Sequence, residues 1–442
     1  MANPPTTLSS SLIFLVLLAH AALLAAALLH PADFLSLQAI SKSLRDTPGS
    51  SFLASWDFTS DPCGFPGVSC DSSSPYRRVH VLSLGDPRAS APGLTGRLDP
   101  AIGNLSSLTD LAILPGRVFG RIPQSLSQLK NLRFLAAARN FLSGGIPAEL
   151  GLLRKLQTLD LSYNRLTGPL PRAVGSLPLL SNLVLCHNQL SGPVPPFLSQ
   201  TLTRIDLKHN ELSGPIPPAY LPPSLQYLWL SSNRLSGPVD RLLSRLTNLS
   251  QLDLSMNQFT GPIPGQVFNY PITTLHLQRN AFSGPVRPAA PVAITTVDLS
   301  YNRLSGEMSP ELSTVESLYL NNNRFTGQVP RSFVDQLLDS SIRVLYLQHN
   351  FLTGIEIDGT EKIPVRSSLC LQYNCMVPPA QSHCPLRAGR WKSRPAGQCR
   401  AHGGGAKMYK GKKKVTEINY KNKPNNNQNH LKVSFPRGFG IY

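Results

Sequence analysis

The sequence predicts an α/β solenoid, a curved superhelix with a parallel β-sheet on its concave face and disulfide-bonded ends. Three observations predict this fold class. One motif returns about every 23 residues along most of the 442-residue chain. The chain holds 40 prolines and 32 glycines, and interior prolines break long helices. Of its seven cysteines, only Cys186 lies inside the repeated region. These features argue against a long coiled coil and a polytopic membrane protein.

The repeated motif has the pattern L-x-x-L-x-L-x-x-N-x-L-[ST]-G, as in LQTLDLSYNRLTG from Leu156 and LSQLDLSMNQFTG from Leu249. This period and pattern are those of a leucine-rich repeat. About eleven copies, preceded by an irregular one from Val79, fill residues 78–368. The asparagines that mark the motif are Asn140, Asn164, Asn188, Asn210, Asn233, Asn257, Asn280, Asn302, Asn323 and Asn350.

Each copy alternates apolar and polar residues with the period of two expected for a β-strand, so Leu159 and Leu161 face inward and Asp160 faces outward. The asparagine amide can donate to and accept from backbone groups at the bend that follows. Glycine and proline come next. The glycine allows the chain to bend, and the proline lies where the sheet needs no backbone N–H donor. We therefore expect mostly 3₁₀ turns and extended backbone on the convex side.

The flanking segments predict the remaining domains. Residues 1–29 end in an apolar run that is typical of a secretory signal peptide. Cleavage is expected after the triplet at 19–21 or after the alanine run at 25–27. An uncleaved N-terminal anchor is the alternative, and no second apolar run of that length follows. Residues 33–71 predict a cap built from a helical pair, residues 369–399 a Cys-rich C-terminal cap, and residues 400–442 a basic disordered tail.

Cysteines of an exported chain are expected to form disulfides. We expect one between Cys63 and Cys70 in the N-terminal cap. Three pairings remain open for the four cysteines of the other cap. These are Cys370, Cys375, Cys384 and Cys399. Cys186 is left over and is expected as an exposed thiol on the concave face.

The formal net charge of +18 lies mostly in the C-terminal segment. Residues 1–386 carry a net charge of +5, and residues 387–442 carry +13. The repeats are therefore nearly neutral, and nucleic acid is not an expected partner. The basic tail is a candidate for contact with acidic pectin or anionic lipid.

The DPCGFPGVSC element from Asp61 and the repeated LSGPIP resemble the plant extracellular leucine-rich-repeat family. That family includes receptor-like kinase ectodomains, receptor-like proteins and polygalacturonase-inhibiting proteins. The end of the array, GIEIDGTEKIPVRSSLCLQYNCMVPP from Gly354, resembles a subgroup without a kinase. The resemblance implies a secreted binding protein of the apoplast or cell wall, with no transmembrane span after the signal peptide.

Catalytic and metal-binding motifs are missing from the sequence: there is no G-x-S-x-G, H-E-x-x-H, G-x-x-x-x-G-K-[ST] or calcium loop. We expect no enzyme, no catalytic residue, no metal and no cofactor. Two sequons, at Asn104 and Asn248, are candidate glycosylation sites.

Binding is the expected chemistry, through the outward residues of the concave strands. Acids and aromatic residues share these positions, a composition that suits a protein or peptide with basic groups. The candidate residues are Trp229, Tyr319, Tyr346, Tyr227, His276, Asp160, Asp206, Asp253 and Asp298. The alternative is a solvated face, because aspartate is ordinary at this position of the repeat.

The leading functional hypothesis is recognition of a protein or peptide at the plant cell surface in signalling or defence, with a receptor kinase ectodomain as one candidate partner. A second hypothesis is inhibition of a cell-wall-degrading hydrolase such as a polygalacturonase. A third is a structural wall protein held on pectin by charge, which salt would release.

Overall fold

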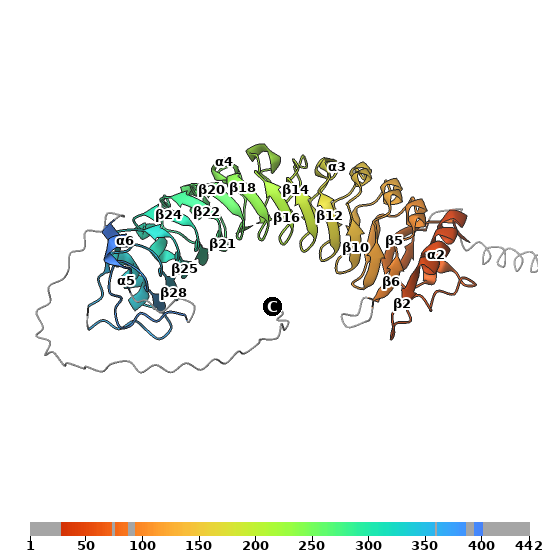
Figure 1. Cartoon of the computed structure of the whole chain (residues 1–442). Coiled ribbons are helices and arrows are strands. Elements are labelled where there is room, and N and C mark those ends of the chain that lie inside the picture. The colour runs from red at the N-terminus through yellow and green to blue at the C-terminus, as the bar shows by residue number, and fades with distance from the viewer. Residues whose placement is uncertain (1–27, 73–75, 87–92, 359, 386–392, 401–442) are drawn as a thin grey trace, which may run out of the picture. The chain divides into compact units, whose positions relative to one another are not determined.

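The structure is a computed structural model that describes residues 28–72, 76–86, 93–358, 360–385 and 393–400. Most of the predicted signal peptide and the predicted tail beyond residue 400 lie outside these ranges. Among the described residues, no helix is both long and apolar enough to cross a membrane. The repeats stack into a curved array (Figure 1), and the prediction of an α/β solenoid is confirmed.

The main sheet has fourteen strands and takes one strand from each repeat. Its strands pair in parallel, except that β3 runs antiparallel to β5. In order they are β3 (Val68–Cys70), β5 (Val79–Leu84), β7 (Asp110–Ile113), β9 (Phe134–Ala136), β11 (Thr158–Asp160), β13 (Asn182–Val184), β15 (Arg204–Asp206), β17 (Tyr227–Trp229), β19 (Gln251–Asp253), β21 (Thr274–His276), β23 (Thr296–Asp298), β25 (Ser317–Tyr319), β28 (Val344–Tyr346) and β30 (Ser368–Cys370).

A second sheet of twelve strands, which the sequence did not predict, is formed mostly by the residues that follow the asparagines, and its first three strands precede the asparagine series. Most of its strands end on a glycine with positive φ, such as Gly261 at +81°. In order they are β2 (Leu44–Asp46), β6 (Leu94–Arg97), β8 (Arg117–Gly120), β10 (Phe141–Gly144), β12 (Arg165–Pro169), β14 (Gln189–Gly192), β16 (Glu211–Gly214), β18 (Arg234–Pro238), β20 (Gln258–Gly261), β22 (Ala281–Gly284), β24 (Arg303–Gly306) and β26 (Arg324–Phe325).

The return side of the repeats holds short helical turns, as predicted. The 3₁₀ turns are η2 (Pro100–Asn104), η3 (Gln124–Gln128), η4 (Ala148–Leu152), η5 (Pro218–Tyr220), η6 (Gly265–Asn269) and η7 (Pro310–Thr314). Three repeats have α-helix instead, in α3 (Arg172–Gly175), α4 (Asp240–Leu243) and α5 (Arg331–Leu338). The eight residues of α5 make it the longest of these three helices, and it buries Phe333 and Leu337.

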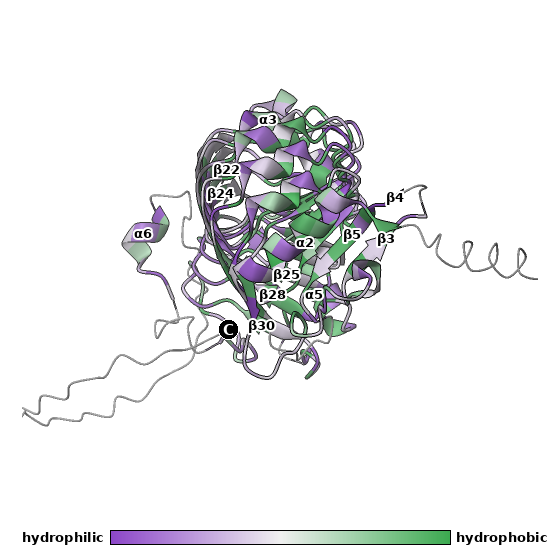
Figure 2. Ribbon diagram, turned by 90° about the vertical axis from the view of Figure 1, so that its right-hand side faces the viewer, coloured by the Kyte–Doolittle hydropathy of each residue, from purple (hydrophilic) through white to green (hydrophobic). Residues whose placement is uncertain are grey.

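The N-terminal cap differs from its prediction. A single α-helix, α2 (Pro31–Ser43), lies across the end of the stack (Figure 2), and residues 50–60 form turns and loops that lead to the 3₁₀ turn η1 (Pro62–Gly64). The apolar residues of these turns are held by side-chain packing, since Trp56 stacks on Phe65 at 5.4 Å and its Nε1 donates to the Pro66 carbonyl oxygen. The cap also includes β1 (Leu28–Leu29), which pairs with β4 (Tyr76–Arg77).

Leucine positions of successive repeats form one continuous core. Leu159, Leu161 and Leu166 are at most 1% exposed, as the alternation predicts. At the C-terminal end, β27 (Gln328–Val329) pairs with β29 (Gly354–Ile355), and α6 (Ala396–Arg400) is tied back to the array through Cys399. Because each repeat covers the next, the leucines are buried only in the stack.

The buried asparagines join neighbouring repeats. Oδ1 of Asn257 accepts the Leu235 amide at 3.0 Å, and its Nδ2 donates to the Leu230 carbonyl oxygen at 2.8 Å and the Leu254 carbonyl oxygen at 3.2 Å. The same pattern recurs along the column and continues to Asn374, one repeat beyond the predicted series. Each asparagine thus connects the end of a main-sheet strand to the second sheet of the preceding repeat.

Replacing one buried asparagine tests this role. Asn257→Ala leaves backbone groups without partners, and we expect the free energy of unfolding to fall by about 2–4 kcal/mol. Urea denaturation followed by circular dichroism measures the change. The control is Asn269→Ala, at an exposed residue, which should change stability by less than about 0.5 kcal/mol. Equal effects of the two substitutions would contradict a structural role for the column.

Candidate functional site

The predicted binding residues lie in one column down the middle of the main sheet. The strand register places Asp206 beside Trp229, Trp229 beside Asp253, and Asp253 beside His276. Asp298, Tyr319 and Tyr346 then continue the column. Four strand steps separate Trp229 from Tyr319, or about 19 Å. The aromatic residues therefore form two groups instead of one stripe.

The first group is centred on Trp229. The Arg204 guanidinium lies 4.8 Å from the ring centroid of Trp229, Lys208 Nζ lies 5.4 Å from it, and the Tyr227 ring lies 5.7 Å away. Nε of Arg204 is buried and, among the described residues, has no hydrogen-bond partner. The arrangement offers an aromatic surface edged by two cations.

Arg204 and Lys208 were missed by sequence reasoning. Lys208 takes the place that serine holds in the L-D-L-S copies of the motif, and this departure was a usable signal. Arg204 lies two residues before Asp206, in the column that also contains Tyr227. Its closeness to Trp229 depends on the pairing of β15 with β17.

The aspartates of the column already form hydrogen bonds or ion pairs with residues of their own turns. Oδ1 of Asp253 accepts from the amide and the hydroxyl of Ser255, at 3.0 and 2.6 Å, and Asp160 makes the same contacts with Ser162. Asp206 is only 2% exposed and pairs with Lys208 at 3.5 Å. Much of their role is therefore to close the turn after the strand.

The second group combines two tyrosines with polar residues beside them. Tyr319 and Tyr346 meet edge to face with ring centroids 5.4 Å apart. Burial, and then the neighbouring Tyr346 and Asp298, raise the pKa of Tyr319. Burial also raises the pKa of Asp298, although its Ser300 contacts oppose the shift. His276 lies between Asp253 and Asp298 in the strand register. Its buried Nδ1 has no hydrogen-bond partner within the described part of the chain.

A second column lies at the edge of the sheet, directly before the asparagines. All eleven of its residues have φ between 54° and 61°, a left-handed conformation that is unusual for bulky side chains. Arg139 lies over Tyr163 at 4.5 Å, Tyr163 stacks on His187 at 4.2 Å, and His187 stacks on His209 at 4.3 Å. Ring stacking between repeats accompanies this backbone conformation.

Cys186 is buried, which corrects the predicted exposed thiol. Cys186 forms no disulfide, but it is only 4% exposed. It occupies the position two residues before the asparagine, which buried serines fill in other repeats. Burial, and then the nearby Asp206, raise the pKa of its thiol to about 12. Such a thiol is unreactive at neutral pH.

The remaining predicted site residues are the cysteines of the two caps and the two asparagines of the sequons. The disulfides are Cys63–Cys70, Cys370–Cys384 and Cys375–Cys399, so the pairing left open by the sequence is resolved in the structure. Asn104 and Asn248 are exposed, which leaves both sequons accessible, and their glycosylation stays a prediction. No group of three potential metal ligands occurs within the described ranges.

Two family models match the chain. The leucine rich repeat N-terminal domain matches residues 30–71, and the leucine rich repeat matches residues 155–177, 224–246, 248–269 and 314–335. A search of curated proteins gave no significant match.

Plant receptors are among the solved structures with the same fold. The plant peptide hormone receptor RGFR1 in complex with RGF2 is 28% identical, with 64% of this chain and 46% of that chain covered and a TM-score of 0.55. The ectodomain of the Arabidopsis thaliana receptor kinase GASSHO1/SCHENGEN3, in complex with CASPARIAN STRIP INTEGRITY FACTOR 2, is 27% identical, with 77% and 50% covered and a TM-score of 0.57. The chain thus spans about half the length of these two ectodomains.

A plant ice-binding protein is also similar, at 27% identity and a TM-score of 0.52, with 76% of this chain and 99% of that chain covered. The matched domains, the repeat geometry and these neighbours agree with the resemblance seen in the sequence. The chain thus contains leucine-rich repeats and the N-terminal domain that precedes such repeats, and it is similar to plant leucine-rich-repeat ectodomains.

The buried state of Cys186 predicts its reactivity. At pH 8 without reductant, we expect the native thiol to react with Ellman's reagent at least about 100-fold more slowly than the unfolded chain, because little thiolate forms. One thiol per chain should titrate in urea, since the other six cysteines are paired. Rapid reaction of the native protein would show that the thiol is accessible.

The histidine stack predicts a pH dependence. Burial, and then the charges of His209 and Lys208, lower the pKa of His187 below its usual value of 6.5. The unfolded state therefore binds more protons between pH 6.5 and the lower folded pKa, and stability contributed by His187 falls as the pH drops through this window.

An NMR titration of the His187 ring measures this pKa. His209→Gln removes a neighbouring charge and should raise the pKa of His187 towards 6.5. His383→Gln, in the C-terminal cap, is the control and should leave it unchanged. A pKa of His187 that does not respond to His209→Gln would contradict coupling within the stack.

Proposed function

We propose that the concave face binds a protein or peptide at the plant cell surface, in signalling or defence. The observation that carries this proposal is the cluster of Arg204, Tyr227 and Trp229, with Lys208 at its edge. Its aromatic rings lie outward on a concave sheet, and the Arg204 Nε lacks a partner among the described residues. A buried donor without a partner costs free energy that a ligand acceptor would recover.

The ligand that suits this face is an extended segment with mixed chemistry. Near Trp229 it would present an acidic or carbonyl group to Arg204 and Lys208 and an apolar group to the ring. About 19 Å further along the column, it would meet the Tyr319 and Tyr346 pair. Between them His276 offers a buried nitrogen, and Asp298 offers a carboxyl whose pKa is raised by burial.

The similar structures support binding of this kind. The RGFR1 and GASSHO1/SCHENGEN3 structures are complexes with RGF2 and CASPARIAN STRIP INTEGRITY FACTOR 2. The Arabidopsis receptor kinase HAESA, 26% identical with a TM-score of 0.51, was solved with a peptide hormone and the co-receptor SERK1. By this likeness we also propose an extracellular location and a receptor kinase ectodomain as a candidate partner. Secretion through the predicted signal peptide is part of the proposal.

A comparison of two variants tests the concave face. Trp229→Ala, Tyr319→Ala and Tyr346→Ala together remove both aromatic groups. The control combines Leu152→Ala and Leu198→Ala, which replace exposed apolar residues on the return side. Wild type and both variants are used to capture ligands from extracellular fluid, and the affinity of each captured ligand is then measured by calorimetry.

We expect the aromatic variant to bind at least about 30-fold more weakly and the control to bind as wild type does. Circular dichroism verifies that both variants fold. If the aromatic variant captures the same ligands with the same affinity, the concave face is not the binding site.

A further inference from the structure

The first five strands of the second sheet carry a concentration of positive charge. From β2 to β12 these strands, the end of α2 and the residue after β8 hold six exposed cations, whereas the repeats as a whole are nearly neutral. The cations are Lys42, Arg45, Arg97, Arg117, Arg121 and Arg165. Five strands span about 19 Å in the direction of the array, so the charges form an extended strip.

Register aligns this strip into two rows. One row runs from Arg45 through Thr95 to Arg117, across β2, β6 and β8. The other runs from Arg97 through Phe119 to Phe141, across β6, β8 and β10. One row therefore contains two cations, and the neighbouring row contains a cation followed by two phenyl rings.

The phenyl rings are exposed and bordered by guanidinium groups. Phe119 is 41% exposed and Phe141 is 37% exposed, although large apolar side chains usually avoid water. The Arg97 guanidinium lies 5.4 Å from the Phe119 ring, and that of Arg165 lies 4.5 Å from the Phe141 ring. These contacts hold flat apolar surfaces and cations side by side.

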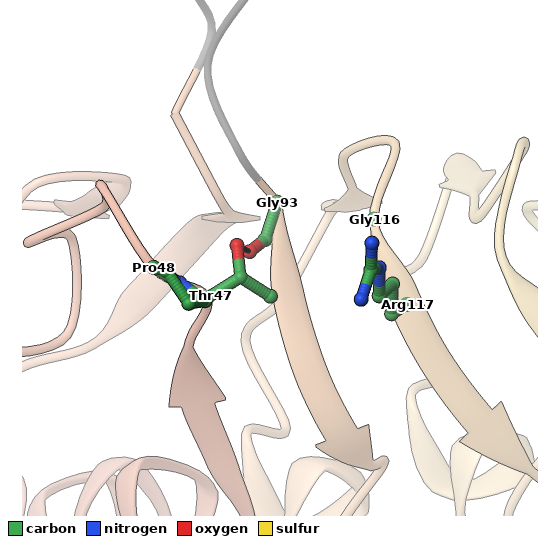
Figure 3. A pocket seen from close by; sticks show the side chains of 5 residues that line it. All are labelled: Thr47, Pro48, Gly93, Gly116 and Arg117. Atoms are coloured by element: carbon green, nitrogen blue, oxygen red, sulfur yellow. Dashed lines mark hydrogen bonds between the residues drawn. The ribbon is translucent and has the colours of Figure 1, made fainter.

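Two hollows flank the strip. One, of about 580 Å³, is lined by Lys42, Arg45, Arg97 and Phe119 among others. The other, of about 360 Å³, has Thr47, Pro48 and Gly93 on one side and Gly116 and Arg117 on the other (Figure 3). The two glycines approach so closely that an added β-carbon on Gly93 would meet the Gly116 Cα at 2.4 Å, so no side chain can fill the second hollow from this position.

Asp46 directly follows Arg45 in β2, and Asp99 lies two residues after Arg97. Asp46 accepts hydrogen bonds from the Ser50 hydroxyl and from the amides of Leu53 and Ala54. Asp99 accepts from the Ala101 amide at the start of η2. Both carboxylates are thus engaged in local structure, and six cations face solvent beside them.

We propose that this strip, residues 42–45, 95–97, 117–121 and Phe141 with Arg165, is a binding site for a linear chain of uronic acids. Carboxylates repeated along such a chain match cations repeated on successive strands. The apolar faces of the sugar rings match the exposed phenyl rings. The site lies on the second sheet and is distinct from the concave face, so the protein can hold a polyanionic glycan and a peptide ligand on different surfaces.

Two charge-reversed variants test the site. The first is Arg97→Glu with Arg117→Glu, within the strip. The matched control is Arg303→Glu with Arg324→Glu, at exposed arginines of β24 and β26 near the other end of the same sheet. Both variants change the net charge of the full-length chain by the same amount, so a difference between them reports position.

Calorimetry measures binding to an oligogalacturonate that spans at least about 19 Å. Its fully methyl-esterified form removes the charge and keeps the sugar backbone, and poly-glutamate represents an acidic polypeptide. We expect the strip variant to bind the oligogalacturonate at least about tenfold more weakly and the control to stay within about twofold of wild type. Phe119→Ala should weaken binding of the oligogalacturonate severalfold and leave binding of poly-glutamate unchanged.

Several outcomes overturn the proposal. The proposed site is contradicted if the wild type does not bind the oligogalacturonate or if the two charge variants lose equal affinity. It is also contradicted if the esterified oligomer binds as tightly as the charged one. Poly-glutamate that binds as tightly as the oligogalacturonate, or an oligogalacturonate affinity insensitive to Phe119→Ala, would overturn the assignment to a sugar chain. The strip variant is also tested for capture of concave-face ligands, and circular dichroism verifies that it folds. This test separates failure of the glycan-binding proposal from failure of the peptide-binding proposal.

Discussion

The hydrogen bonds of the buried asparagine column are the interactions on which the rest of the structure depends. At most repeats the chain turns from the main sheet into the second sheet through a residue with positive φ, and the turn exposes backbone groups that no strand pairs. Each asparagine satisfies three or more of them, as Asn257 does, and links two repeats. Because the same bonds recur at each turn, successive repeats stack in one register. That register aligns outward residues into columns, and the columns are the candidate binding surfaces.

The concave face shows how structural and binding roles divide within one column. Asp160 and Asp253 use one carboxylate oxygen to close the turn after their strands, so they are less available to a ligand than their outward position predicts. The residues that break the regular motif carry more of the binding chemistry. Trp229 supplies an aromatic surface, while Arg204 and His276 each keep a buried nitrogen without a partner among the described residues. Irregularity within a regular array therefore marks the candidate site.

Most repeats contribute one strand to each sheet, and this doubles the surfaces that the array can use. Residues before the asparagine face the concave side, and residues after it face the outer side of the second sheet. Substitution on one side leaves the leucine core and the asparagine bonds intact. The outward residues around Arg97 and Phe119 can therefore differ from those of other strands of the second sheet without loss of the fold.

The sequence by itself determined the solenoid, the concave strands, the buried leucines and the column that contains Trp229, because a period of about 23 residues maps linear positions onto aligned columns. It did not predict the second sheet, since four residues ending in glycine carry a weak strand signal and pair only after the repeats stack. Burial of Cys186, the closeness of Arg204 to Trp229 and the pairing of the last four cysteines were likewise decided by tertiary structure. Each depends on which groups from neighbouring repeats come together, and local periodicity does not specify such contacts.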